Sequence, residues 1–547
     1  MNPKPFSMGS FSIALITTFL LFASAMASRP NMGQQYYSAT PSNILVSTCK
    51  ASRDPASCES VINQSGHVPP GTTTTALQVI SSLLNLTLQN LETAESQLKN
   101  ILANSGANLN LTKAANSSLQ SVVYARYRVL MTVQCDFTRR EKLKDGRAWM
   151  GAALSFNLGV LASLKNVNTT VVAAFMDFSN TTLIPTTRDA LSMLANYDIY
   201  GDDTDSWGPI LTERDGFWEP VNSQWSGFVG GVPKGLPYNA TVCKDDGGDQ
   251  CTYKTVQEAV DAAPRFNAAG KFVIWIKAGV YNETVRVVLD QQNVVLLGDG
   301  IGRTVITGSL MNAGQPGMRT MQSATVAVVG DGFMARDITF ENTAVGNPAV
   351  AFRSNADRTV MESCQFRGNQ DTLYARALRQ YYKSCRIQGN VDFIFGNAAA
   401  FFQDCEILIA PRPSTPEAGE DNVITAHGRP EAVQSTGFVF QNCSINGTEE
   451  YMEVYRKHKK VHHNYLGRPW REYSRTVFIG CNYGDMISEK GWFPWVGEFA
   501  LKTLYYGEYG NTGTNTSGRV EWSSTVPEDR VSSYSLSNFI QGDQWIH

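Results

Sequence analysis

The chain has 547 residues, of which 43% are hydrophobic and 17% charged, and its formal net charge at pH 7 is -3. This length exceeds what one hydrophobic core usually organises, so we expect two domains. The near-neutral charge gives no basis for binding nucleic acid, and we expect no such partner.

A signal peptide is predicted at residues 1–27. Lys4 precedes an apolar run at 11–22, and Ala25-Met26-Ala27 supplies the small residues of a cleavage site. The run is short for a bilayer span, although an uncleaved membrane anchor is the alternative. N-glycosylation sequons are crowded in the first half of the chain, at Asn85, Asn110, Asn116, Asn168, Asn180 and Asn239. We therefore expect a secreted, extracellular glycoprotein with no membrane attachment after cleavage.

Residues 40–200 have the period of amphipathic helices. Apolar residues recur at steps of three and four, and one face is expected on each of two helices. These faces are Leu77, Ile80, Leu84, Leu88 and Leu91, and then Val123, Tyr127, Leu130 and Met131. The region holds no cluster of His, Cys and acidic residues, so we expect a packing, folding or interaction module.

Residues 201–238 are rich in Gly, Pro, Trp and Asp and are predicted to be a linker to a second domain at 239–547. In that domain a short β-rich phrase recurs, and its matching positions are 338, 364, 385, 405 and 443. Their spacings are 26, 21, 20 and 38 residues. A strand-forming repeat near twenty residues predicts a parallel β-helix, and the long last interval predicts a coil with an inserted loop.

Two acids, Asp371 and Asp392, stand among apolar and aromatic residues. They are 392 − 371 = 21 residues apart, which is one coil, so neighbouring rungs would place them about 4.8 Å apart. Two carboxylates this close cannot both ionise cheaply, so one pKa should rise while the other stays low. That pair would supply one proton donor and one anion, as a hydrolase needs. The alternative is an Asp ladder that caps the turns of the coils.

Ten cysteines in an exported chain favour disulfides over metal ligation, because their spacings lack a metal-binding ladder. Cys49 with Cys58 and Cys243 with Cys251 are close in sequence. Four others recur at the spacing of one coil or of the longer looped coil, namely Cys364, Cys385, Cys405 and Cys443. Spacing allows Cys385 to pair with either of its nearer neighbours, so this choice stays open.

The second domain resembles the plant pectin methylesterases. Six ordered motifs carry the resemblance: GVYNE (279–283), QDTLY (370–374), DFIFGNA (392–398), LGRPW (466–470), GWFPW (491–495) and LYYGEYGNTG (504–513). The resemblance implies a right-handed parallel β-helix that hydrolyses the methyl esters of galacturonate units in cell-wall pectin. No metal or other cofactor is expected.

The resemblance also implies a role for each matching residue. Asp392 is expected to be the nucleophile and Asp371 the general acid and base. Gln370 is expected to stabilise the oxyanion, and Arg468 to orient Asp392. The sugar chain is expected to contact Trp470, Arg468 and Phe393. Trp495 is either a further sugar contact or a structural aromatic residue.

One position departs from the family pattern. Pro348 stands where the family has an oxyanion-pocket Gln, 371 − 348 = 23 residues before Asp371, and loss of one such donor costs roughly 2.7 to 4 kcal/mol. Asn347 is a candidate substitute. The alternative to an active esterase is therefore a weakened protein that binds pectin or acts as an inhibitor.

The Cys49-x8-Cys58 start, the phrase GRAWMGAAL (146–154) and the four-helix texture make the helical half resemble the pectin methylesterase inhibitor domain. This resemblance implies an up-and-down four-helix bundle that serves as an autoinhibitory or folding pro-region. In the inhibitor-domain pattern Cys135 lacks the cysteine that it usually pairs with. Cys481 of the second domain also has no expected disulfide partner. Residues 220–240 contain Lys234 as their only basic residue, whereas the family commonly has a basic dipeptide for cleavage. A polysaccharide lyase or a glycosidase on the same solenoid is the competing enzyme class.

Overall fold

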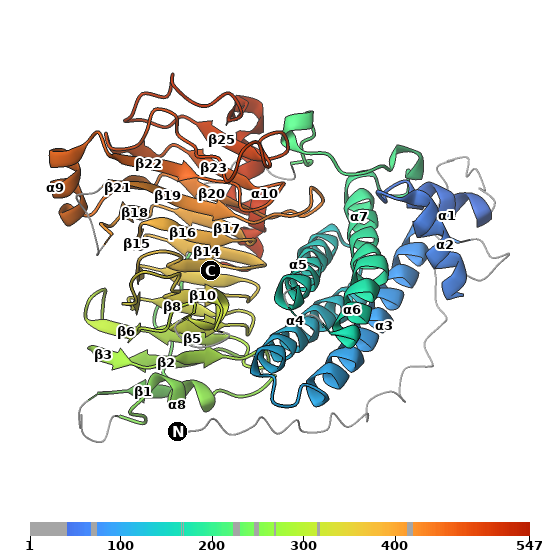
Figure 1. Ribbon diagram of the computed structural model, residues 1–547, viewed down its shortest axis with the longest axis horizontal. Coiled ribbons are helices and arrows are strands. Elements are labelled where there is room, and N and C mark those ends of the chain that lie inside the picture. Colours follow the sequence, from blue (N-terminus) through green and yellow to red (C-terminus); the bar gives the residue numbers. More distant parts are fainter. Residues whose placement is uncertain are drawn as a thin grey trace. The chain divides into compact units, whose positions relative to one another are not determined.

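The computed structural model describes residues 41–66, 74–165, 167, 169–221, 230–244, 251–266, 270–313, 318–412 and 419–547. Residues 41–547 form one compact unit. The predicted signal peptide at 1–27 and the sequon at Asn168 lie outside the described residues. Figure 1 shows a helical region and a stack of short strands that follow each other along the chain.

The helical region is a four-helix bundle with additional helices. Its α-helices are α1 (Pro41–Cys49), α2 (Pro55–Ser65), α3 (Ala76–Ala103), α4 (Leu109–Val133), α5 (Arg140–Leu164), α6 (Thr170–Phe178) and α7 (Ile184–Tyr200). α3 packs on α4, α4 on α5, α5 on α7, and α7 on α3, which closes a ring of four. Thr75 caps α3 by accepting the amide of Gln78. The expected bundle is confirmed, and a π-helical turn at Ser179–Leu183 joins α6 to α7.

The remaining domain is a parallel β-helix built from three long sheets. All named strand pairs in these sheets are parallel, and Figure 1 shows the coils stacked in chain order. Sheet A consists of β1 (Ala240–Val242), β2 (Phe272–Ile276), β5 (Val294–Leu297), β8 (Met334–Arg336), β11 (Thr359–Glu362), β14 (Arg379–Lys383), β17 (Ala399–Gln403), β20 (Gly437–Gln441), β23 (Arg475–Ile479), β25 (Tyr505–Tyr509) and β26 (Ser524–Thr525). Sheet B consists of β3 (Gly279–Asn282), β6 (Thr304–Gly308), β9 (Thr339–Asn342), β12 (Gln365–Arg367), β15 (Arg386–Gly389), β18 (Glu406–Ile409), β21 (Ser444–Gly447) and β24 (Asn482–Tyr483). Sheet C consists of β4 (Val285–Val287), β7 (Val326–Val328), β10 (Phe352–Ser354), β13 (Leu373–Ala375), β16 (Val391–Gly396), β19 (Glu420–His427) and β22 (His462–Gly467).

Three α-helices accompany the coils: α8 (Val256–Asp261), α9 (Glu449–His458) and α10 (Leu536–Ile540). α9 follows β21 and therefore lies beyond the interval between positions 405 and 443, which contains β18, β19 and β20. The solenoid core is stacked along its axis. A ladder of aromatic rings with successive centroids 4.5–4.7 Å apart runs through Tyr382, Phe402, Phe440 and Phe478. Such stacks fix the register of the coils because each ring packs on its in-register neighbour.

The recurring phrase is the corner between sheets A and B. The residue before each matching position has a positive φ, from 49° to 63°, at Asp337, Ser363, Ser384, Asp404 and Asn442. This left-handed conformation turns the chain sharply, and Asn and Asp tolerate it better than most residues. The residues after the corner pair in the predicted register, for example Gln365 with Thr339 and with Arg386. The predicted repeat is therefore confirmed.

The cysteines of the recurring phrase do not form bridges. Cys49 is bonded to Cys58 and Cys243 to Cys251, as expected. The other predicted candidates are free and buried, namely Cys364, Cys385, Cys405 and Cys443. Equivalent side chains on neighbouring coils point in the same direction about 4.8 Å apart, whereas a disulfide needs Cβ atoms about 3.8 Å apart. The prediction that coil cysteines pair is wrong, and these thiols serve as small apolar core residues.

The predicted linker is partly built into the solenoid. Glu213, in the short 3-10 helix Glu213–Asp215, has a buried side chain that pairs with Arg475. Trp218 packs edge-on against Tyr505 and Tyr534. The described linker residues therefore contribute a carboxylate and an aromatic ring to the packing of the second domain.

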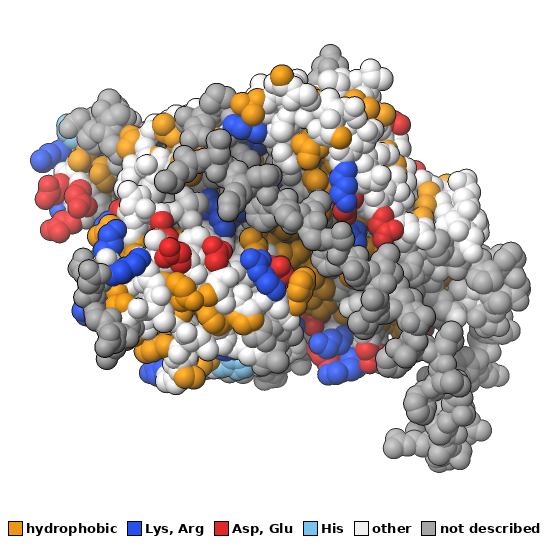
Figure 2. Space-filling model, turned by 90° about the horizontal axis from the view of Figure 1, so that it is seen from below, with side chains coloured by type: hydrophobic (Ala, Val, Ile, Leu, Met, Phe, Trp, Pro, Cys, Tyr) orange, Lys and Arg blue, Asp and Glu red, His pale blue; other side chains and the backbone are white. Residues whose placement is uncertain are grey.

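Charged side chains of both signs are interspersed on the face that Figure 2 shows. Among the residues that the structure describes, no helix combines the length and the hydropathy that a membrane span requires.

Candidate active site

The two acids lie on neighbouring coils of sheet C. β13 pairs with β16 so that Leu373 is opposite Ile394, which brings Asp371, two residues before Leu373, level with Asp392. Both acids have a positive φ, 67° for Asp371 and 50° for Asp392, and the register between β16 and β19 shifts at Asp392. Such a bulge and such strained backbone re-aim a side chain and are common at active sites. Their position one coil apart agrees with the spacing in the sequence.

Arg468 binds the carboxylate of Asp392 through a bidentate contact. It follows β22, and its amide donates to the carbonyl of Thr425 at 2.9 Å. Its Nε and Nη2 donate to the two carboxylate oxygens of Asp392 at 2.7 and 2.6 Å. The guanidinium also lies over the ring of Trp495 at 4.5 Å. This geometry fixes the direction of the Asp392 carboxylate and favours its charged form.

Burial gives the two acids unequal pKa values. Burial and the neighbouring charge of Asp392 raise the pKa of Asp371 well above its ordinary value of 3.8, and Arg468 only partly opposes this. Burial also raises the pKa of Asp392, while the hydrogen bonds and charge of Arg468 oppose the rise. The expectation that the pKa of Asp392 stays low is therefore not met, because desolvation outweighs Arg468. Asp371 is the acid that more readily keeps its proton.

Replacing Asp371 with Asn is expected to stabilise the protein at neutral and alkaline pH. The raised folded-state pKa means that the native state binds more protons than the unfolded state between about pH 4 and that pKa, so stability falls as pH rises through this window. We expect Asp371→Asn to raise the free energy of unfolding by about 1 kcal/mol or more at about pH 8, and to change it little at about pH 3.5. Denaturant unfolding at both values measures this, with exposed Asp404→Asn as the control. A variant that is less stable than the wild type at the higher pH would contradict the raised pKa of Asp371.

A cleft of about 940 Å³ opens beside the acids. Aromatic rings form its floor: Tyr374 stacks on Phe395 at 4.1 Å, and Phe395 packs edge-on against Trp470. A Cβ on Gly428 would come within 2.5 Å of the Trp470 ring, so glycine at this position leaves room for the ring. Phe393, in contrast, is 0% exposed in the solenoid core. The expected sugar contact at Phe393 is corrected to Phe395. In a regular strand these two residues would share a face, but the register shift between Val391 and Ile394 turns Phe393 into the core.

Several side-chain amides line the cleft. Gln370 is one of them, as expected from its motif. Asn312 is another, and its backbone amide donates to the carbonyl of Pro348 at 2.8 Å. Asn347 is exposed, and its amide lies 3.9 Å from the sulfur of Met311, so it does not replace the missing family donor. Sequence reasoning missed Asn312 because it comes from a connection that has no repeat period.

The helical region forms one wall of the same cleft. Residues of α5 and its surroundings line it together with the acids: Ser155, Leu158, Gly159, Leu161, Ala162, Ser163, Lys165, Met176 and Asn180. Ser155 on α5 also accepts a hydrogen bond from Asn397 of the solenoid at 2.7 Å. No sequence pattern predicted these residues, since they approach the acids only when the two regions pack together.

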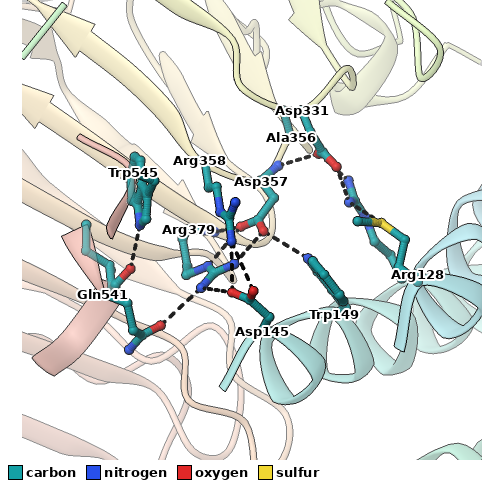
Figure 3. Close-up of polar contacts among 12 residues, drawn as sticks. Arg128, Asp145, Trp149, Asp331, Ala356, Asp357, Arg358, Arg379, Gln541 and Trp545 are labelled. Carbon is teal, nitrogen blue, oxygen red and sulfur yellow. Dashed lines mark hydrogen bonds and ion pairs between the residues drawn. The ribbon is translucent and has the colours of Figure 1, made fainter. Parts of the chain in front are cut away.

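A buried network of arginines and acids anchors the helical region, as Figure 3 shows. Asp145 of α5 pairs with Arg379 at 2.8 Å and with Arg358 at 3.0 Å. Asp357 accepts from Arg379 at 2.7 Å and from the Trp149 indole at 2.9 Å. A second contact joins Arg128 of α4 to Asp331 through two hydrogen bonds. Charges buried in this way are costly to unpair, which favours a persistent interface.

Family models and relatives agree with this division of the chain. A family model described as Pectinesterase matches residues 239–543, and one described as Plant invertase/pectin methylesterase inhibitor matches residues 43–193. The chain is 53% identical to the probable pectinesterase/pectinesterase inhibitor 64 of Arabidopsis thaliana over 509 residues, which cover 91% of this chain and 83% of that protein.

Two further similarities concern the second domain. Pectinesterase 2 of Citrus sinensis is 44% identical over 316 residues, which cover 56% of this chain and 58% of that protein. The solved structure of a pectin methylesterase from carrot is 44% identical, with a TM-score of 0.53, and the match covers 57% of this chain and 95% of that chain.

Proposed function

Because the chain belongs to the pectinesterase family, we propose that Asp392 and Asp371 carry out the hydrolysis of pectin methyl esters. The enzyme is a carboxylic-ester hydrolase that removes methyl groups from galacturonate units and releases methanol. The Asp392 carboxylate attacks the ester carbonyl, and Asp371 gives its proton to the departing methanol. Asp371 then takes a proton from water, which cleaves the resulting acyl-enzyme and restores Asp392.

The remaining cleft residues support these steps. The side chain of Gln370 donates to the oxygen that becomes negative in the tetrahedral intermediate, and Asn312 is a second amide at the same cleft. Arg468 keeps Asp392 charged and directed at the carbonyl. Tyr374, Phe395 and Trp470 provide flat apolar surfaces for sugar rings.

One observation carries this proposal: two mostly buried carboxylates on adjacent coils, one gripped by Arg468, open onto a single cleft. The test is to incubate the full chain with methyl-esterified pectin and to measure methanol and polymer length together. Methanol release at constant length supports the esterase. Shortened chains would indicate a lyase or glycosidase, and binding without methanol would indicate a pectin-binding protein.

The helical domain acts as a pro-region that restricts the cleft. Its α5 lines the site, and buried ion pairs hold it against the solenoid. We place this domain at about residues 40–200 and the catalytic domain at 239–547, joined by 201–238. The protein is secreted to the plant cell wall, where its substrate occurs, with no membrane attachment and no nucleic-acid partner.

Replacing Arg468 with Lys is expected to slow methanol release and to shift its pH dependence. Lysine supplies one point charge in place of a two-pronged contact, so Asp392 is less well oriented and its pKa rises further. Activity requires ionised Asp392 and protonated Asp371, so the rate rises with pH through the first pKa and falls through the second. We expect a loss of about 100-fold in kcat and a rising limb moved to higher pH. An unchanged pH profile would show that Arg468 does not act on Asp392.

A further inference from the structure

The outer face of sheet C continues past the cleft as a column of side chains. Tyr374 and Phe395, which line the cleft, are in register with each other and with Arg353 on β10. In-register residues of parallel strands point to the same face, so Arg353 extends the cleft by one coil toward the first coils. Arg286 on β4 lies two coils further along the same column, with small Ala327 between them.

The arginines of this column lack acidic partners. Arg353 is 6% exposed, and its Nε has no hydrogen-bond partner. Arg376, directly after β13, has a buried Nη1 that also has no hydrogen-bond partner. Arg286 donates to the backbone carbonyls of Val285 and Thr325. In the described part of the chain none of these three arginines takes part in an ion pair, although a buried cation is normally paired.

The pKa values of Arg353 and Arg286 are lowered because both side chains are buried and unpaired cations lie close together. Burial and the neighbouring charge of Arg376 lower the pKa of Arg353 to about 10. Burial and Arg353 in turn lower the pKa of Arg286 to about 9. The column therefore consists of desolvated cations that repel one another. A bound anion would reduce this repulsion.

The helical domain contacts Arg353, Arg376 and Arg319, and none of its described residues gives them a carboxylate. The phenol of Tyr124 on α4 is buried close to Arg353, and the ring of Phe156 on α5 faces the Arg376 guanidinium at 5.2 Å. Arg319, which lines the cleft, donates to the carbonyl of Ser163 at 2.5 Å, in the last turn of α5. That end of a helix carries a partial negative charge, so α5 offers Arg319 a weak substitute for an anion.

The anchoring network shows a different pattern. In Figure 3 the arginines that join the two regions meet carboxylates, as Arg128 does with Asp331 and Arg379 with Asp145. The arginines over sheet C lie at the same interface, yet they meet rings and carbonyls. Docking of the helical domain therefore does not account for them, and a ligand that brings carboxylates does.

We propose that Arg286, Arg319, Arg353 and Arg376 form a binding track for the carboxylates of galacturonate units that have already lost their methyl groups. The planar guanidinium matches a carboxylate in geometry and charge. Arg353 and Arg286 lie on coils before that of Asp371, and Arg376 lies on the coil of Asp371 itself. In the docked state α4 and α5 contact Arg353, Arg376 and Arg319. This inference rests on the proposed function, and it adds that unesterified pectin competes with the helical domain for the same surface.

Hydrogen exchange of the full chain tests the track directly. We expect unesterified oligogalacturonate to speed amide exchange in α4 and α5, because it displaces the helices from the arginines. The variant Arg353→Met/Arg376→Met should need about tenfold more oligomer for the same effect. Arg386→Met, which removes an exposed arginine paired with Glu406 on sheet B, is the matched control. A neutral glucose oligomer of equal length should have no effect.

Thermal unfolding without oligomer supplies a second measurement. Arg353→Met removes a buried unpaired cation, so we expect the midpoint to rise by about 1 °C or more. A lower midpoint would show a stabilising contact for Arg353 in the docked state and would overturn the track. Unchanged exchange at saturating oligomer, or an equal response from the double variant, would overturn it as well.

Methanol release is measured separately on the same wild-type chain. If methanol is released but the oligomer does not alter exchange, the track is wrong and the proposed function stands. If the oligomer alters exchange through Arg353 and Arg376 but no methanol appears, the anion track stands and the proposed hydrolysis fails.

Discussion

Replacing Asp392 with Asn is expected to reduce kcat for methanol release by about 10⁴-fold or more, as for the loss of other catalytic nucleophiles. The amide cannot attack the ester carbonyl, and it leaves the Arg468 guanidinium without its anion. Asn is the appropriate replacement because residue 392 has a φ of 50°, which Asn tolerates better than Ala. The loss therefore reports on chemistry and not on the backbone.

Asp404→Asn is the matched control for this experiment. Asp404 also has a positive φ, 52°, but it is exposed at a corner between sheets A and B. Its replacement should leave methanol release and stability close to those of the wild type. Methanol should be measured together with binding of pectin, which Asp392→Asn retains. If that variant kept a tenth or more of the wild-type rate, Asp392 would not be the nucleophile.

Replacing Arg379 with Met is expected to lower the free energy of unfolding by about 3–5 kcal/mol, the usual cost of breaking a buried ion pair from one side. Arg379 is 2% exposed and contacts two buried carboxylates, those of Asp357 and Asp145. Its removal leaves the Asp357 carboxylate with the Trp149 indole and the backbone amide of residue 379 as its hydrogen-bond partners. Denaturant unfolding followed by tryptophan fluorescence measures the loss.

The control for Arg379 is Arg386→Met. Arg386 is half-exposed and pairs with exposed Glu406, and such surface pairs contribute about 0–1 kcal/mol. Equal effects of the two substitutions would show that the buried network does not stabilise the packed state. A loss confined to α4 and α5 in hydrogen exchange would show that the network anchors the helical region and leaves the solenoid intact.

The solenoid was predictable because its repeat is local and periodic. Each coil turns at a residue such as Asp404 or Asn442 and then sends a core residue inward, so the spacing of the phrase carries the register. The acids at one-coil spacing followed from the same register. Asn312 and Arg319 were not predictable, because the connection that carries them has no period and reaches the cleft only in three dimensions.

Helix faces were predicted less well than coils. On α3 the expected Ile80, Leu84 and Leu91 are fully buried. On α4 the expected face includes Leu130, which is 39% exposed, whereas Val122 and Val129 are fully buried. Small residues of α4 such as Ala115 and Ala125 are also buried, because α4 packs on helices and on the solenoid at once. A single apolar stripe does not describe a helix with two buried sides.

The segment 213–219, which follows the helix bundle, contacts both the solenoid and the helical region. Glu213 inserts its carboxylate between Arg475 and Arg429 of the solenoid, while Glu219, six residues later, grips Arg147 of α5. Two acids of one short segment therefore form ion pairs with both the helical region and the solenoid. Hydrolysing one peptide bond between the helical region and the solenoid would leave these ion pairs intact, so a nick alone would not remove α5 from the cleft.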